Sequence, residues 1–185
     1  MRKAITAAVA SVSLVAQPTA LLAEGAEGKP RDPRMGNPTL PSESCDAATI
    51  RRFVPANTTI AFVTREVGGI CRVNGTITTQ KPGPNRVNFV LAMPDNFNGR
   101  YVFLGVGGAA GQLPAMKPSL LAKGYALAGT DSGTGAKSAA DFSFKSNPAK
   151  LVDFQWRGVR STAIVTQQIT RGYYNRPKIG RFISG

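Results

Sequence analysis

The chain has 185 residues, of which 42% are hydrophobic, so it is long and apolar enough for one domain with a core and is not wholly disordered. Its 20 glycines and 13 prolines favour a loop-rich β or α/β protein over a helical bundle. The formal net charge is +13, but no run of five Lys or Arg occurs and no aromatic residues interleave with them, which argues against nucleic-acid binding. A basic soluble surface is the simpler interpretation, and an anionic polymer as partner is the alternative.

Residues 1–23 have the three-part pattern of a cleaved export signal. Arg2 and Lys3 form a basic start, a stretch rich in Ala, Val and Leu follows, and Ala23 offers a small residue for cleavage. A membrane anchor is the alternative, but the apolar stretch is short for a spanning helix and Pro18 interrupts it. We therefore expect a secreted or periplasmic protein that no later segment ties to a membrane.

Residues 24–44 are polar and rich in Gly and Pro, which predicts a flexible linker with order beginning near Cys45. Cys45 and Cys71 are the only cysteines, and an even number in an oxidising compartment usually forms a bond. Such a bond would close a loop of about 25 residues and contribute roughly 3 kcal/mol. Two buried free thiols or a metal pair are the alternatives, although the absence of histidine argues against structural zinc.

The folded region begins with the pattern of antiparallel strands joined by short turns. Three segments rich in β-branched and apolar residues are the expected strands: Thr59–Thr64, Ile70–Thr79 and Val87–Met93. Gly68-Gly69 separates the first two, and Lys81-Pro82-Gly83-Pro84-Asn85 separates the last two.

A strand–loop–helix rhythm follows, as expected for a parallel sheet. The expected elements, in chain order, are a buried strand at Tyr101–Leu104, a glycine-rich loop at 105–111, a short helix at Met116–Lys123, a strand at Tyr125–Gly129, a loop at 131–140, a helix at Phe154–Tyr174 with Asp153 as a cap, and a strand at Arg181–Ser184. On the long helix, Val159, Ala163, Thr166, Ile169 and Tyr173 fall close to one face. Antiparallel strands leading into a parallel sheet predict an incomplete α/β-hydrolase core for residues 45–185.

The glycine-rich loop directly follows the apolar strand, where α/β-hydrolases carry one donor of the oxyanion hole. Small residues let the backbone approach a ligand and direct N–H groups at a negative oxygen, so Gly107, Gly108 and Ala109 are the oxyanion-loop candidates. An ordinary strand–helix turn is the alternative. A phosphate-binding loop is a third interpretation, but the Lys-Ser/Thr of that motif is missing.

The final strand ends in Gly185, where a nucleophile elbow would begin. A serine hydrolase needs a base to take the proton of its nucleophile, and the chain has no histidine. No catalytic residue is therefore expected within the chain: the nucleophile, acid and base would lie beyond Gly185.

The order of several motifs resembles the tannase and feruloyl esterase family, from about Cys45 to the end. The matching stretches are Cys71-Arg72-Val73-Asn74-Gly75-Thr76-Ile77, Met93-Pro94-Asp95-Asn96-Phe97-Asn98-Gly99-Arg100, the loop 105–111, residues 123–133, Ala140-Asp141-Phe142, Asp153-Phe154-Gln155-Trp156-Arg157, Tyr173-Tyr174-Asn175-Arg176-Pro177 and Phe182-Ile183-Ser184-Gly185. The last stretch resembles the residues that lead into the family's Gly-Cys-Ser-x-Gly-Gly elbow.

The resemblance implies a secreted ester hydrolase that acts on phenolic esters, small or polymer-linked, with a Ser-Asp-His triad and a lid inserted after the elbow. It also supports pairing Cys45 with Cys71, and it implies no cofactor and no metal here, since the calcium often found in the lid would not be held. The chain departs from the family where Ala109 and Ala110 replace glycines and where Thr134 and Arg160 replace histidines. We expect a truncated hydrolase that is inactive alone. A basic, non-enzymatic binding module for an anionic polymer is the alternative.

Overall fold

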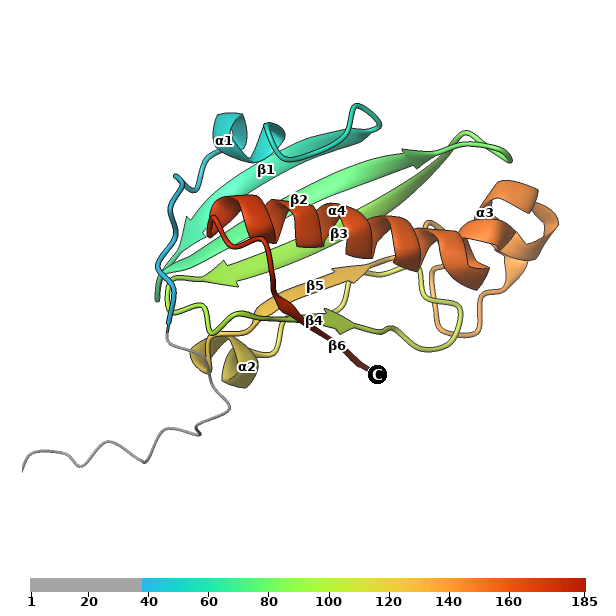
Figure 1. Cartoon of the computed structure of the whole chain (residues 1–185). Coiled ribbons are helices and arrows are strands. Elements are labelled where there is room, and N and C mark those ends of the chain that lie inside the picture. Colours follow the sequence, from blue (N-terminus) through green and yellow to red (C-terminus); the bar gives the residue numbers. More distant parts are fainter. Residues whose placement is uncertain (1–37) are drawn as a thin grey trace, which may run out of the picture. The chain divides into compact units, whose positions relative to one another are not determined.

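A computed structural model describes residues 38–185, which form one six-stranded mixed sheet in the order β1-β2-β3-β5-β4-β6 (Figure 1). The predicted export signal and residues 24–37 of the predicted linker lie outside the described residues.

The first three strands form an antiparallel meander, as the sequence predicts. They are β1 (Thr58–Glu66), β2 (Ile70–Thr79) and β3 (Asn85–Pro94). Gly68 and Gly69 make the first turn with positive φ angles of 87° and 73°, which glycine adopts without the strain that a Cβ adds. The β2–β3 register pairs Thr79 with Asn85, so the end of β2 and the start of β3 lie side by side.

The other three strands are short and form the parallel part: β4 (Arg100–Leu104), β5 (Ala126–Thr130) and β6 (Gly180–Ser184). β4 lies between β5 and β6 and runs parallel to both, whereas β5 pairs antiparallel with β3. The residues of β5 are all buried, which explains its continuous apolar pattern. This mixed sheet confirms the expected antiparallel-then-parallel α/β fold.

The helices begin and end differently from the prediction. They are α1 (Ala47–Arg51), α2 (Pro118–Ala122), the 3₁₀ turn η1 (Ser143–Ser146), α3 (Pro148–Val152), the π turn η2 (Asp153–Arg157) and α4 (Gly158–Tyr173). The helical stretch starts at Pro148, and the side chain of Asn147 caps it by accepting from the amides of Ala149 and Lys150. The prediction that Asp153 is a cap is wrong, because Asp153 lies inside the helical run and is fully buried.

Helices pack on both faces of the sheet. α4 crosses one face (Figure 1), where its buried Val165, Ile169 and Tyr173 join the larger core. α2 packs on the opposite face, where Leu121 contacts a smaller core that includes Val102 and Leu127. The predicted face of the long helix is partly right: Thr166, Ile169 and Tyr173 are buried, but Val159 and Ala163 are only half-buried. The buried stripe passes through Thr162, Val165 and Thr170 instead.

Residues 39–42, which precede Cys45, form backbone hydrogen bonds with the rest of the domain. The amide of Thr39 donates to Phe97 O over 2.7 Å, and the amide of Ser42 donates to Tyr173 O over 3.0 Å. Ordered contacts therefore begin before Cys45, where the sequence predicts flexible linker, because the backbone of residues 39–42 pairs with the β3–β4 connection and with the end of α4. Cys45 and Cys71 form the disulfide, with Cα atoms 5.7 Å apart.

β6 is an edge strand whose outer side has no partner among the described residues. Its Phe182 and Ile183 side chains are 52% and 75% exposed. A shallow groove runs between β6 and α4, lined by apolar residues of both together with Gln167 and Arg181. No helix of the described part of the chain is long and apolar enough to cross a membrane.

Candidate functional site

The glycine loop at 105–111 begins beside the end of β6. Leu104 pairs with Ser184 across the parallel β4–β6 ladder, and the amide of Gly105 donates to Ser184 O over 2.7 Å. The carboxyl ends of neighbouring parallel strands meet at one edge of a sheet, which is where ligands bind in open α/β folds. The loop and Gly185 therefore lie together at that edge, as an oxyanion loop and a nucleophile elbow do in α/β-hydrolases.

Two of the three predicted oxyanion donors have free amides. The N–H groups of Gly107 and Gly108 donate to no acceptor within residues 38–185. The prediction for Ala109 is wrong, because its amide donates to Ala139 O over 2.8 Å and its side chain is fully buried. Of the three candidates, only Gly107 and Gly108 can therefore offer N–H groups to a ligand.

The two glycines differ in the space around them. A Cβ on Gly107 would meet nothing within 4 Å, whereas a Cβ on Gly108 would lie 2.5 Å from Ala139 O, and Gly108 has a φ of 59°. Gly107 also lines a small hollow of about 250 Å³ with Val106, Gln112 and Ser138. Glycine is thus required at 108 by backbone geometry and close packing, and at 107 it leaves open space above the amide.

The turn formed by residues 131–136 contacts the last residue of the glycine loop. The amide of Gly111 donates to Asp131 O over 2.9 Å, and a Cβ on Gly111 would lie 2.7 Å from the Ala136 amide nitrogen. Ala109 and Ala136 also pack together with the buried ring of Phe144. The far end of the glycine loop is therefore in direct backbone contact with the 131–136 turn.

The carboxylate of Asp131 is buried and accepts hydrogen bonds from the turn and from β3. Its Oδ1 accepts from the amides of Asn88 and Gly133, at 2.9 and 2.8 Å, and its Oδ2 accepts from Asn88 Nδ2 at 2.6 Å. Burial raises the pKa of Asp131 above its usual value, and these hydrogen bonds oppose the shift. All three donors come from the adjoining backbone and β3, so Asp131 has a structural role here.

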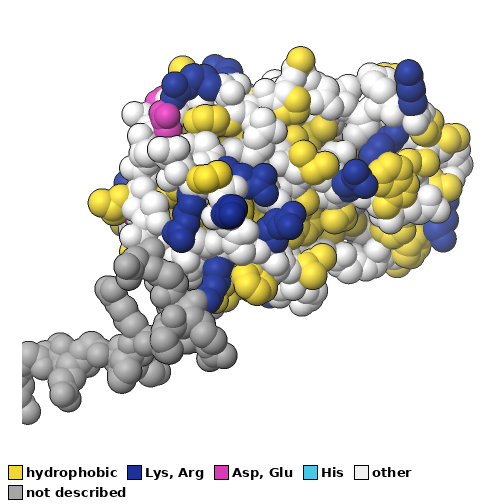
Figure 2. Space-filling model, in the orientation of Figure 1, with side chains coloured by type: hydrophobic (Ala, Val, Ile, Leu, Met, Phe, Trp, Pro, Cys, Tyr) yellow, Lys and Arg dark blue, Asp and Glu magenta, His cyan; other side chains and the backbone are white. Residues whose placement is uncertain are grey.

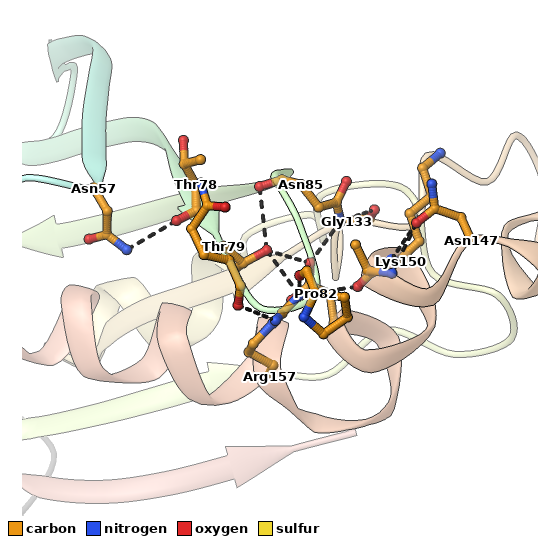
Figure 3. A network of polar contacts seen from close by, with 12 residues as sticks. Asn57, Thr78, Thr79, Pro82, Asn85, Gly133, Asn147, Lys150 and Arg157 are labelled. Carbon is orange, nitrogen blue, oxygen red and sulfur yellow. Dashed lines mark hydrogen bonds and ion pairs between the residues drawn. The ribbon is translucent and has the colours of Figure 1, made fainter.

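A buried polar network lies at the same edge of the sheet, and the sequence analysis missed it (Figure 3). Arg157 Nε pairs with Asp153 Oδ1 at 2.5 Å, and the other guanidinium nitrogens donate to the carbonyls of Gln80, Pro82 and Ala149. Thr79 and Asn85 both donate to Asp153 Oδ2 at 2.7 Å. The signal was present in the sequence as an Asp and an Arg four residues apart within a helix.

Three further residues were singled out in the sequence: Gly185, Thr134 and Arg160. A Cβ added to Gly185, the predicted start of the elbow, would meet nothing within 4 Å. Thr134 is buried and its hydroxyl accepts from the Ala136 amide, while Arg160 is exposed on α4. No group of three potential metal-binding side chains occurs in the described residues.

The basic charge is distributed over the surface. After Asp141 the only acidic residue is Asp153, which is buried and paired with Arg157. On the face that carries α4, Lys and Arg side chains form separate groups divided by polar and apolar surface (Figure 2). The structure thus shows a basic face without one continuous basic track.

Three comparisons with known proteins agree. A family model described as tannase and feruloyl esterase matches residues 71–185. The chain is 35% identical over 118 residues to a probable feruloyl esterase of Arthroderma benhamiae, covering 58% of this chain and 22% of that protein. It is 25% identical over 162 residues to the uncharacterized esterase Atu5261 of Agrobacterium fabrum, covering 82% and 28%. The match thus spans 22% to 28% of the length of these relatives.

Solved structures show the same fold. Feruloyl esterase B from Aspergillus oryzae superposes with a TM-score of 0.64 at 20% identity, over 75% of this chain and 30% of that chain. Tannin acyl hydrolase from Aspergillus niger superposes with a TM-score of 0.60 at 16% identity, over 81% and 33%.

Proposed function

The chain belongs to the tannase and feruloyl esterase family of carboxylic ester hydrolases, and from this premise we propose that residues 45–185 are the N-terminal part of an esterase domain acting on esters of phenolic acids. The names of the relatives support the substrate class, since they include feruloyl esterases and a tannin acyl hydrolase.

One observation carries the proposal: the free amides of Gly107 and Gly108 lie on a loop bonded to the end of β6. In ester hydrolysis a nucleophile attacks the carbonyl carbon, and negative charge develops on the carbonyl oxygen. Backbone N–H groups fixed in advance stabilise that charge, and each donor is worth about 10²–10³ in kcat. A serine placed shortly after Gly185 would attack a carbonyl whose oxygen is held by these amides.

On this proposal, residues 1–185 are inactive alone. The sequence contains no histidine, so no imidazole can take the proton of a serine nucleophile. The base, the nucleophile and the lid that selects the ester would come from further polypeptide.

Export by a cleaved signal at residues 1–23 is part of the proposal. It rests on the sequence pattern of those residues and on the Cys45–Cys71 bond, because disulfides persist in oxidising compartments.

The test is a chimera in which residues 45–185 replace the aligned segment of Aspergillus oryzae feruloyl esterase B, assayed with methyl ferulate and with methyl gallate. Residues 1–185 alone serve as the matched control and should release no acid above the buffer rate. The proposal predicts that the folded chimera hydrolyses at least one of the two esters. A chimera that unfolds cooperatively but hydrolyses neither would refute it.

A further inference from the structure

We infer that Asn85 positions the glycine loop by tying the 131–136 turn to the buried Asp153–Arg157 pair. An effect of Asn85 on catalysis depends on the proposed function, whereas its hydrogen-bonded connection to the glycine loop does not. Asn85 is thereby a positioning residue, acting through the turn and the loop.

The anchor of this arrangement is rigid because nearly every polar group in it is bonded. Asp153 is fully buried, and its two oxygens accept from Arg157, Thr79 and Asn85. The Arg157 guanidinium also donates to carbonyls on both sides, in the 80–82 turn and in α3. Removing one partner of such a buried ion pair is strongly destabilising, because it leaves an uncompensated buried charge.

Asn85 is the arm that reaches from this anchor to the turn. Its Nδ2 donates both to Asp153 Oδ2, at 2.7 Å, and to Gly133 O, at 3.0 Å (Figure 3). The contact is close, since a Cβ on Gly133 would lie 2.8 Å from Asn85 Nδ2. The two hydrogens of one amide group therefore connect the buried carboxylate to the backbone of the turn.

The 131–136 turn is in turn hydrogen-bonded to the end of the glycine loop. The amide of Gly133 donates to Asp131 Oδ1, and Asp131 O accepts from the amide of Gly111 at the end of the glycine loop. Ala136 packs against Gly111 from the same turn. The path from Asp153 through Asn85, Gly133 and Asp131 to Gly111 is thus continuous in hydrogen bonds and covalent bonds.

The position of this end of the loop bears on the proposed donors, because their own N–H groups are not bonded to the protein. Gly107 and Gly108 donate to no acceptor in residues 38–185, so their direction depends on the bonds of the loop residues around them. In the middle of the loop, the amide of Ala109 donates to Ala139 O, and the amide of Ala110 donates to Gly107 O. β6 fixes the first end through Gly105, and the 131–136 turn fixes the second through Gly111. Catalytic donors must be held within about 0.5 Å of their working positions.

Three substitutions separate this role from general stabilisation. Asn85→Ala removes the arm between Asp153 and Gly133. Thr79→Val removes a hydrogen bond of the same length to the same carboxylate oxygen, Asp153 Oδ2, together with longer bonds of its hydroxyl to Asn85 O and Arg157 Nη2. Thr79 makes no side-chain hydrogen bond to residues 131–136 of the described chain. Asn85→Asp is a second variant of the arm, because it places an acceptor where both neighbours are acceptors.

Amide hydrogen exchange of residues 1–185 is the readout, compared at equal global stability set by denaturant. Exchange at Gly111 and Gly133 should be about tenfold faster in both Asn85 variants and unchanged in Thr79→Val. Equal effects of Asn85→Ala and Thr79→Val on these amides, or none in either Asn85 variant, would overturn the inference.

The esterase chimera supplies a second readout, in which Asn85→Ala should lower kcat more than Thr79→Val with KM little changed. The exchange experiment needs no activity, so it tests the positioning link even if the proposed esterase function fails.

Discussion

The amide of Gly105 donates to the carbonyl oxygen of Ser184 over 2.7 Å, which joins the first residue of the glycine loop to the last residue of β6. These two residues are far apart in the sequence but adjacent in the sheet, since β4 and β6 pair in parallel. The bond therefore sets the position of the start of the glycine loop relative to the end of β6.

The Cys45–Cys71 bond should stabilise the domain measurably. The cysteines are 26 residues apart, and closing a loop of that size contributes roughly 3 kcal/mol in the chain-entropy model. The double variant Cys45→Ala/Cys71→Ala should therefore lose about 3 kcal/mol of unfolding free energy, with an added cost from truncating the buried Cys71 side chain. Urea unfolding of the wild-type and variant chains measures this loss, and a difference below about 1 kcal/mol would contradict it.

The buried and the surface ion pairs should differ strongly in their effect on stability. Asp153→Asn weakens a pair in which the carboxylate is fully buried and leaves Arg157 without its counter-charge, so it should cost about 3–5 kcal/mol. The matched control is Glu66→Gln, which breaks the more exposed pair with Arg72 and should cost at most about 1 kcal/mol. Equal losses in urea unfolding would argue that the Asp153–Arg157 pair is not buried as described.

Asp141 should titrate well below an ordinary aspartate. Hydrogen bonds from the amides of Lys137 and Ser143 hold the pKa of Asp141 at about 2, against 3.8 for the free side chain. Because the folded pKa is lowered, the stabilisation from Asp141 is present above pH 3.8 and is lost as the pH falls towards 2. Carboxyl NMR should give this pKa, and Asp141→Asn should flatten the acid limb of the stability curve. A pKa near 3.8 would contradict the two hydrogen bonds.

The open edge of β6 should make the chain self-associate. Exposed edge strands with apolar side chains pair with other chains, and a charge on the edge opposes this. Ile183→Lys should therefore lower the weight-average mass in sedimentation experiments. Val67→Lys is the control, since Val67 is fully exposed in the β1–β2 turn and not on the β6 edge. If both variants, or neither, reduce association, the β6 edge is not the contact.

The sequence predicted most of the sheet because its signals are local. Alternating and continuous apolar runs located the strands to within a few residues, and Gly68-Gly69 and the Pro-rich segment 81–85 marked the turns. The neighbouring positions of the glycine loop and the last strand followed from the fold class, which fixes which strands pair.

The sequence could not predict features that depend on distant contacts. Ala109 had the small side chain of an oxyanion donor, but its amide is bonded to Ala139, thirty residues later. Asp153 stood where a helix cap belongs, yet its partners Thr79 and Asn85 lie on β2 and β3. Which amides are free and which charges are paired is decided by tertiary packing, which periodicity does not report.

Removing the N–H of Gly107 tests the proposal that the Gly107 and Gly108 amides hold the carbonyl oxygen of an ester. Gly107 does not have a positive φ, and a Cβ there meets nothing, so Gly107→Ala keeps the donor in open space while Gly107→Pro removes it. In the esterase chimera, Gly107→Pro should lower kcat about 10²–10³-fold relative to Gly107→Ala with KM little changed. Equal kcat values for the two variants would contradict the claim for Gly107.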